Sequence, residues 1–422
     1  MLTLKIIREQ QAFVIERLKI KNIDATQTIA QIVAIDDERK ALQTKLDACL
    51  AEQNSVAKQI GALMQQGKKE EAEAAKSQTA TLKEQSKILE TQFADAEQKL
   101  NDLLVQLPNL PSEQVPAGRT PEDNMIIREN GAIPTLAQKL PHWELTKKYD
   151  IIDFDLGVKL TGAGFPVYKG AGAKLQRALI SFFLDCNIAA GYSEIQPPLM
   201  VNEASGFGTG QLPDKEGQMY HMGVDNFYLI PTAEVPVTNI FRDVILEPQN
   251  MPIKLTAYTP CFRREAGSYG KDVRGLNRLH QFDKVEIVQV QLPQNSYQAL
   301  DEMVLHVEGI LKQLELPYRI LKLCGGDMSF TSALTFDFEV FSAAQERWLE
   351  VSSVSNFESF QANRLKLRYR DENKKTQLAH TLNGSSLALP RIVAALLENN
   401  QTPEGIRIPK VLQKYTGFEM IQ

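Results

Sequence analysis

The chain has 422 residues, of which 43% are hydrophobic and 23% are charged, and its formal net charge is -5. This length exceeds that of an ordinary domain with one hydrophobic core and favours two or three domains. The composition excludes wholesale disorder, and the net charge argues against a protein coated with basic residues for nonspecific nucleic-acid binding. Any contact with a nucleic acid must therefore be local.

Membrane and metal-binding classes are also disfavoured. No apolar run approaches the roughly twenty residues that a membrane-spanning helix needs, and charges interrupt the first residues, MLTLKIIREQ. We therefore expect a cytoplasmic protein without membrane contact. The cysteines form no CxxC pair and have no histidine at ligand spacing, so no zinc site is expected and a reducing compartment is favoured. These cysteines are Cys49, Cys186, Cys261 and Cys324.

The segment from about Thr26 to Leu104 is rich in residues that favour helices. Two series of apolar residues recur every seven positions, which predicts two helices with coiled-coil seams. Glycine and polar residues at 65–69 predict a chain reversal, so the helices pack antiparallel as an arm on the order of 50 Å long. The first series and its companions are Ile32, Ile35, Leu42, Leu46, Cys49, Val56, Ile60 and Leu63; the second are Ala75, Leu82, Leu89, Phe93, Ala96, Leu100 and Leu103.

Such an arm, taken alone, is more often a dimerisation or spacer element than a ligand-binding one. Several lysines dot its outer half and suit contact with an RNA backbone by shape. A solvated helical face explains some of them as well. They are Lys58, Lys68, Lys69, Lys76, Lys83 and Lys87.

Prolines and turn formers at 107–124 predict a linker between an N-terminal domain at 1–106 and a second domain at 125–422. From Trp143 onward, short β-rich runs alternate with helical stretches without a regular β-helix-β repeat. This pattern favours an α+β domain on a mostly antiparallel sheet with flanking helices. The glycines of TGAGFPVYKGAGAK match neither the Rossmann nor the P-loop pattern and are interpreted as turn residues.

Three polar segments of the second domain contain candidate functional residues. GYSEIQPPLMVN at 191–202 follows a long helix and ends in a proline-containing strand, which alone is commonplace. CFRREAGSYG at 261–270, with a returning strand HQFDKVE at 280–286, presents an arginine and an acid toward one cavity, as binding a triphosphate beside an amino acid requires. LNGSSLALPR at 382–391 places Arg391 near a helix N-terminus, which also attracts phosphate.

In order and spacing these segments resemble the three signature motifs of class II aminoacyl-tRNA synthetases. Two further segments, PTAEVP at 231–236 and EVSSVSNF at 350–357, resemble the seryl-tRNA synthetase family specifically. The resemblance implies a class II catalytic domain, a homodimer, and an arm that binds tRNA(Ser). Ser386 and Pro390 stand where the family typically has glycines, so the backbone near Arg391 is expected to differ slightly.

Arg263 can direct two donors at the α-phosphate of ATP, and serine requires carboxylates and small polar groups for its ammonium and hydroxyl. A pocket that pairs the hydroxyl rejects alanine, and its size would exclude threonine. The resemblance implies catalytic roles for Arg263, Arg391 and Glu350; serine binding by Thr232, Ala233, Glu234, Arg263, Glu286, Asn383 and Ser385; ATP binding by Arg263, Arg264, Glu265, Glu350, Val351, Ser352, Ser353 and Arg391; and Mg²⁺ binding by Glu350 and Ser353.

The implied reaction begins with attack of the serine carboxylate on the α-phosphorus of ATP and continues with transfer of the seryl group to the 3′ end of tRNA(Ser). Charging of tRNA(Sec) is left open. Two alternatives are an amino acid:carrier-protein ligase of the same fold and an inactive coiled-coil scaffold. The full-length arm argues against the first, and the retained arginines and glutamates argue against the second.

Overall fold

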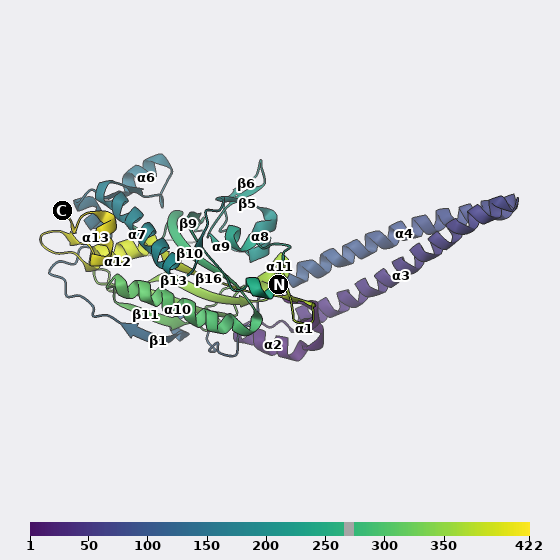
Figure 1. Ribbon diagram of the computed structural model, residues 1–422, viewed down its shortest axis with the longest axis horizontal. Coiled ribbons are helices and arrows are strands. Elements are labelled where there is room, and N and C mark those ends of the chain that lie inside the picture. The colour runs from purple at the N-terminus through teal and green to yellow at the C-terminus, as the bar shows by residue number, and fades with distance from the viewer. Residues whose placement is uncertain (266–273) are drawn as a thin grey trace. The chain divides into compact units, whose positions relative to one another are not determined.

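The computed structural model describes residues 1–265 and 274–422, so the segment AGSYG of the second motif lies outside the described residues. The chain divides into two compact units (Figure 1). One comprises residues 2–19 and 23–108, and the other comprises residue 1, residues 20–22 and residues 109–422. Among the described residues, none of the helices is both long and apolar enough to cross a membrane.

The helices are α1 (Leu4–Glu9), α2 (Gln11–Ile20), α3 (Thr26–Gln65), α4 (Lys69–Leu104), α5 (His142–Lys148), α6 (Phe154–Leu160), α7 (Gly170–Ala189), α8 (Glu203–Thr209), α9 (Glu234–Asn239), α10 (Ser296–Gln313), α11 (Phe360–Leu365), α12 (Leu389–Asn399) and α13 (Lys410–Thr416). Short 3₁₀ turns are η1 (Pro121–Asp123), η2 (Pro248–Asn250) and η4 (Pro293–Asn295).

The strands are β1 (Met125–Asn130), β2 (Ile152–Asp153), β3 (Val167–Tyr168), β4 (Ser193–Glu194), β5 (Met200–Asn202), β6 (His221–Met222), β7 (Phe227–Leu229), β8 (Ile245–Leu246), β9 (Ile253–Phe262), β10 (Gln281–Gln291), β11 (Tyr318–Lys322), β12 (Leu334–Ser342), β13 (Arg347–Glu358), β14 (Arg368–Arg370), β15 (Thr376–Leu378), β16 (His380–Ala388), β17 (Ile406–Arg407) and β18 (Met420–Ile421).

The smaller unit is built on the antiparallel hairpin of α3 and α4, which confirms the predicted coiled coil (Figure 1). The chain reverses at Gly67, whose φ of +74° lies in the left-handed region that glycine adopts without a Cβ clash. Most apolar residues of the two predicted heptad series meet along one seam. The buried members are Leu42, Leu46, Cys49, Val56, Ala75, Leu82, Leu89 and Ala96, with Ile60, Leu63 and Phe93 partly buried beside them.

The inner end of the hairpin holds a buried acid that the heptad pattern did not predict. Asp36 is 1% exposed, whereas its neighbour Ile35 is only half-buried. Arg8 from α1, Arg39 and Lys40 pair with the Asp36 carboxylate at 2.8, 2.9 and 2.7 Å. Burial alone raises the pKa of this carboxyl, but the bonds to Lys40 and Arg39 bring it below its ordinary value. The ion cluster thereby ties α1 to α3.

The larger unit is organised around an eight-stranded sheet with the order β1-β11-β12-β13-β16-β10-β9-β4. Each neighbouring pair is antiparallel except β4 and β9, so the expectation of a mostly antiparallel sheet is confirmed. Helices α7, α10 and α12 bury their apolar residues in one core against this sheet, and α9 and α11 also pack against its strands. The expected α+β class with flanking helices is therefore observed.

Candidate active site

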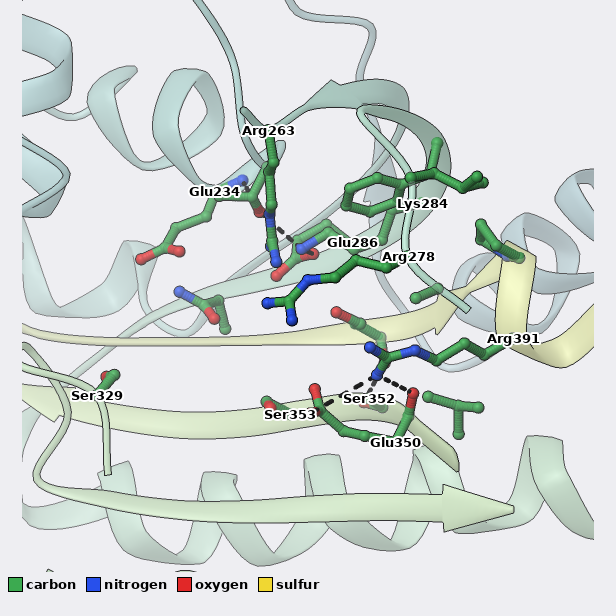
Figure 2. A pocket seen from close by; sticks show the side chains of 18 of the residues that line it. Glu234, Arg263, Arg278, Lys284, Glu286, Ser329, Glu350, Ser352, Ser353 and Arg391 are labelled. Atoms are coloured by element: carbon green, nitrogen blue, oxygen red, sulfur yellow. Dashed lines mark hydrogen bonds and ion pairs between the residues drawn. The ribbon is translucent and has the colours of Figure 1, made fainter. Parts of the chain in front are cut away.

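Alternation along β10 separates the apolar core from a polar cavity. Val285 and Ile287 belong to the core that α7, α10 and α12 cover, whereas Lys284 and Glu286 line the cavity. Successive side chains of a strand point to opposite faces of the sheet, so one strand serves both. The cavity has a volume of about 410 Å³. Figure 2 shows the side chains of Arg263, Glu286 and Glu350 directed into it.

Most of the site residues predicted from the sequence line this cavity. Their positions in the chain range from the segment before α9 to the first turn of α12. The nominated residues that line it are Thr232, Glu234, Arg263, Glu265, Glu286, Glu350, Val351, Ser352, Ser353, Asn383, Ser385 and Arg391.

Two nominated residues do not line this cavity. Ala233 is fully buried in a small apolar cluster with Val237, Ala257 and Val288. Arg264 lies beyond the end of β9, and its backbone N–H donates to the carbonyl of Gln218 at 2.8 Å. Direct serine contact by the Ala233 side chain and ATP contact by the Arg264 side chain receive no support from this geometry.

A β-bulge in β13 explains how two nominated residues three positions apart reach the same cavity. In a regular strand Glu350 and Ser353 would point to opposite faces. Glu350 pairs with Glu339, but Ser352 pairs with the adjacent Phe338, so Val351 is an extra residue on this strand. Such an insertion shifts the alternation by one position. Glu350 and Ser353 consequently face the same side.

The Glu234 carboxylate is buried and held by a hydrogen bond. Gln361 from α11 donates to Glu234 Oε1 at 2.6 Å and accepts from the Thr381 hydroxyl at 2.7 Å. Burial and the nearby charge of Glu286 raise the pKa of Glu234 to about 7. A carboxyl with this pKa changes its charge near neutral pH.

Lys284 is a cavity residue that the sequence reasoning missed. Its ammonium forms an ion pair with Glu286 at 2.6 Å and donates to the Thr232 hydroxyl at 2.8 Å. It thereby orders two of the nominated serine ligands. A signal was available, because Lys284 precedes Glu286 by two positions on a strand and must share its face.

The buried pair predicts a large effect on stability. We expect Lys284→Met to lower the free energy of unfolding by about 3–5 kcal/mol, because Glu286 would be left as a buried carboxylate without a countercharge. Urea denaturation of the single variant and of Lys284→Met/Glu286→Leu measures this effect. The double variant should recover most of the loss; equal losses in both would contradict a role for the pair.

Three arginines enter the cavity from different segments. Arg263 stacks on the Phe282 ring, with 5.2 Å between its guanidinium carbon and the ring centroid, and its Nε donates to the Pro231 carbonyl at 3.3 Å. Arg391 donates from Nη1 to the Glu350 carbonyl at 2.7 Å. Arg278, which the sequence reasoning missed, pairs with Glu265. These contacts fix the arginine stems while leaving further N–H groups for a ligand.

The two departures in the third motif each have a defined place in the structure. Pro390 lies in the first turn of α12, where its missing N–H removes no helical bond, and it places Arg391 in that first turn as expected. Ser386 is buried in β16, and its hydroxyl donates to Asn187 Oδ1 at 2.8 Å.

The residues around Glu350 fit a divalent cation that also binds a ligand. No group of three or more His, Cys, Asp and Glu side chains is placed to hold a metal in residues 1–265 and 274–422. Beside Ser353, however, the buried Asp337 has one carboxylate oxygen without a hydrogen-bond partner in this described part. Mg²⁺ prefers oxygen ligands and commonly combines one or two carboxylates with phosphate oxygens. The available oxygens suit that arrangement.

Comparisons with known proteins agree with this architecture. Residues 1–111 match the family model of the seryl-tRNA synthetase N-terminal domain, and residues 220–400 match that of the tRNA synthetase class II core domain (G, H, P, S and T). A Serine--tRNA ligase of Salinibacter ruber is 51% identical, with 100% of this chain and 99% of the relative covered. The chain belongs to the seryl-tRNA synthetase family.

Further relatives of this family span the same length. A Serine--tRNA ligase of Nautilia profundicola is 46% identical over 98% of this chain and 100% of the relative. Among solved structures, the seryl-tRNA synthetase from Pyrococcus horikoshii complexed with ATP has a TM-score of 0.90 and 31% identity, covering 100% of this chain and 99% of that one. The resemblance inferred from the motifs is thus confirmed over the whole chain.

Proposed function

We propose that this chain activates L-serine with ATP to form seryl-adenylate and transfers the seryl group to the 3′ end of tRNA(Ser). The supporting observation is a single cavity that combines buried carboxylates, arginines and small polar groups, in a chain of this family. Relatives named Serine--tRNA ligase match the chain over its full length, N-terminal hairpin included. The carrier-protein ligase and the inactive scaffold are therefore not favoured.

Serine would bind at the end of the cavity where Glu234 and Glu286 lie. The two carboxylates suit the ammonium and hydroxyl groups of serine, and Lys284 limits their mutual repulsion by pairing with Glu286. Thr232, Asn383 and Ser385 supply small polar groups on the same lining. A substrate without a hydroxyl would leave buried polar groups unpaired, which opposes alanine.

ATP would lie across Arg263 and Arg391, with its α-phosphate beside the serine carboxylate. No protein nucleophile is needed, because the reaction is an in-line attack by serine with pyrophosphate leaving. Arg263 would stabilise the charge that grows on the α-phosphate, and Arg391 would bind phosphate oxygens at the N-terminus of α12. Glu265, Val351, Ser352 and Ser353 would complete the nucleotide contacts.

Glu350 and Ser353 would hold Mg²⁺, with Asp337 as a neighbouring acceptor. When bound, the cation neutralises charge on the phosphate oxygens. The bulge at Val351 brings the two ligands to one face, and Arg391 holds the Glu350 backbone carbonyl at 2.7 Å. These residues would therefore orient the nucleotide rather than transfer protons.

The remaining assignments concern the domains, the binding partners and the cellular compartment. Residues 1–106 would form a tRNA-binding domain whose arm at 26–104 grips tRNA(Ser), residues 107–124 a linker, and residues 125–422 the catalytic domain. Exposed lysines on the hairpin support the RNA contact. The enzyme would work as a homodimer in the cytoplasm, where its tRNA is found.

Serine-dependent ATP–pyrophosphate exchange, followed by aminoacylation of bulk tRNA, tests the proposal. We expect serine to support both reactions and alanine and threonine to support neither. Exchange without charging of any tRNA would favour the carrier-protein ligase. Absence of both activities would overturn the enzyme assignment.

The raised pKa of Glu234 predicts a pH dependence of serine use. The serine ammonium requires an ionised carboxylate, and the protonated fraction of Glu234 grows as the pH falls through about 7. We expect kcat/KM for serine to fall toward tenfold per pH unit below pH 7, while KM for ATP changes little. Exchange kinetics between pH 6 and 8.5 measure this, and Glu234→Gln should lower kcat/KM and flatten the profile.

The same pKa shift has the opposite consequence for stability. The folded protein binds this proton more tightly than the unfolded chain does, because the pKa rises from 4.5 to about 7 on folding. Its contribution to the free energy of unfolding is present below pH 4.5 and is lost as the pH rises to about 7. Glu234→Gln should remove this loss in urea denaturation; an unchanged pH dependence of stability would contradict the assignment.

A further inference from the structure

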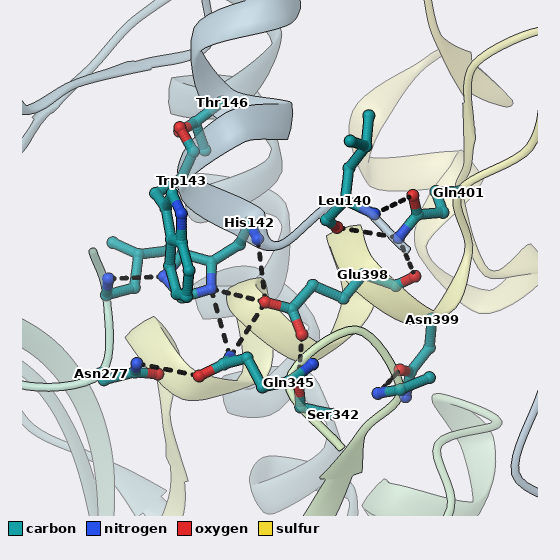
Figure 3. A network of polar contacts seen from close by, with 12 residues as sticks. Leu140, His142, Trp143, Thr146, Asn277, Ser342, Gln345, Glu398, Asn399 and Gln401 are labelled. Atoms are coloured by element: carbon teal, nitrogen blue, oxygen red, sulfur yellow. Dashed lines mark hydrogen bonds and ion pairs between the residues drawn. The ribbon is translucent and has the colours of Figure 1, made fainter. Parts of the chain in front are cut away.

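A buried polar network reaches the cavity lining at Asn277 and includes an acid that the reaction does not use (Figure 3). His142 begins α5 and Glu398 lies near the end of α12, and both side chains are fully buried. Glu398 Oε1 accepts from the His142 backbone N–H at 2.8 Å, from His142 Nδ1 at 2.7 Å and from Gln345 Nε2 at 2.9 Å, and Oε2 accepts from the Ser342 hydroxyl. These donors compensate for the loss of water around a buried carboxylate.

The network dictates the tautomer of the His142 ring. The backbone N–H of Leu276 donates to His142 Nε2 at 2.8 Å, so Nε2 carries a lone pair. The ring proton must then sit on Nδ1, where it is donated to Glu398. Gly275 permits this approach, because a Cβ at that position would lie 2.2 Å from Nε2.

The Glu398 carboxylate also orients two amides. A carboxylate only accepts hydrogen bonds, so Gln345 must turn its NH₂ group toward Glu398 and its Oε1 toward Asn277. Asn277 Nδ2 donates to that oxygen at 3.0 Å. The orientation of the Asn277 side chain is therefore set through Gln345 by a carboxylate that Asn277 does not contact.

The segment held by this network also holds an active-site arginine. The Asn277 backbone carbonyl accepts from Arg391 Nε at 3.0 Å, and Leu276 and Asn277 both line the cavity. Arg391 and Glu398 lie on the same helix, about two turns apart. One helix thus contacts the segment directly at its first turn and, through His142, again near its end.

We propose that His142 and Glu398 are positioning residues for ATP: they fix the Leu276–Asn277 backbone that aims Arg391 and forms one wall of the nucleotide site. The inference rests on the proposed function, because it assigns the nucleotide to the Arg391 side of the cavity. The serine ligands Thr232, Glu234 and Glu286 share no hydrogen bond with the network among the described residues. Loss of the network should consequently affect ATP more than serine.

Two substitutions of His142 test the two hydrogen bonds of its ring separately. Asn places its amide nitrogen where Nδ1 lies, so His142→Asn can keep the bond to Glu398 but loses the bond to Leu276. Gln places its amide oxygen where Nε2 lies, so His142→Gln can keep the bond to Leu276 but loses the bond to Glu398.

In pyrophosphate exchange we expect His142→Asn to raise KM for ATP about 10- to 100-fold, because small misplacements of binding groups have effects of this size. KM for serine should stay within about twofold, and His142→Gln should raise KM for ATP much less. Equal changes in both KM values, or a wild-type KM for ATP in His142→Asn, would overturn the inference.

Glu398→Gln provides a nearly isosteric second variant in case the His142 variants do not fold. This substitution frees the Gln345 amide to turn over, so we expect KM for ATP to rise about tenfold in the wild-type background. In an Arg391→Lys background the rise should be less than twofold, because the effects of mutations at interacting residues do not add. Additive losses would overturn the inference.

The ATP-induced rise in Tm supplies a readout that does not depend on the reaction. A rise in Tm that is present in the wild type and lost in His142→Asn would support the positioning role. This holds even if the wild type shows no serine-dependent exchange, because that failure would overturn the proposed function alone. An equal rise in both proteins would overturn the positioning role.

Discussion

Arg263→Lys should lower kcat for serine-dependent pyrophosphate exchange about 10²- to 10³-fold, the usual loss when one directed donor to a developing charge is removed. Lysine keeps the positive charge but has neither the planar fork of N–H groups nor the stacking on Phe282, so it cannot aim two donors at one phosphate. KM for serine should change less than kcat, because the contribution is made chiefly in the transition state.

Arg319→Lys is the matched control for this prediction. Arg319 also stacks on an aromatic ring, with 4.7 Å between its guanidinium carbon and the Trp348 centroid, but it does not line the cavity. The control should exchange pyrophosphate at nearly the wild-type rate. A wild-type kcat in Arg263→Lys would contradict the role of Arg263 in stabilising charge on the α-phosphate.

Shortening the hairpin should abolish tRNA charging while pyrophosphate exchange survives. Deleting residues 50–63 together with residues 71–84 removes two heptads from each helix symmetrically about Gly67, so the seam register and the turn are kept. The tip moves inward by about 21 Å at 1.5 Å per residue. We expect aminoacylation of bulk tRNA to fall at least about 10²-fold and exchange to stay within about twofold.

A second variant distinguishes the length of the hairpin from its charge. Lys58, Lys69, Lys83 and Lys87 are exposed, and replacing them with glutamine keeps the hairpin length. If they contact phosphates, charging should weaken and become less sensitive to salt. Loss of exchange in the shortened variant would contradict separate roles for the two units, and undiminished charging would contradict tRNA binding by the arm.

Sequence periodicity predicted the regular parts of the fold well. The heptad residues from Leu42 to Ala96 meet as expected because a repeat of seven leaves one stripe of each helix apolar. The ionic cluster around Asp36 was missed, because Arg8 comes from another helix and no local pattern brings it there. Distant pairings of this kind depend on tertiary packing.

The candidate site was predicted mainly through motifs, and its supporting residues were not. Gln361, His142 and Glu398 lie outside the motif residues that were nominated, and each acts by hydrogen bonds to residues distant in the chain. Lys284 is the exception, since its spacing from Glu286 already placed it on the cavity face. A motif indicates which groups meet a ligand but does not name the groups that hold them.

The extra residue in β13 also constrains how this strand can change. Upstream of Val351 the even-numbered Glu350 faces the cavity, whereas downstream the odd-numbered Ser353 and Ser355 do. Removing one residue here would leave a strand that still pairs with both neighbours but reverses the facing of the residues on one side of the deletion, so cavity-facing polar groups there would turn toward the apolar core. Insertions and deletions in this strand should therefore be tolerated far less than substitutions, even at positions that contact no ligand.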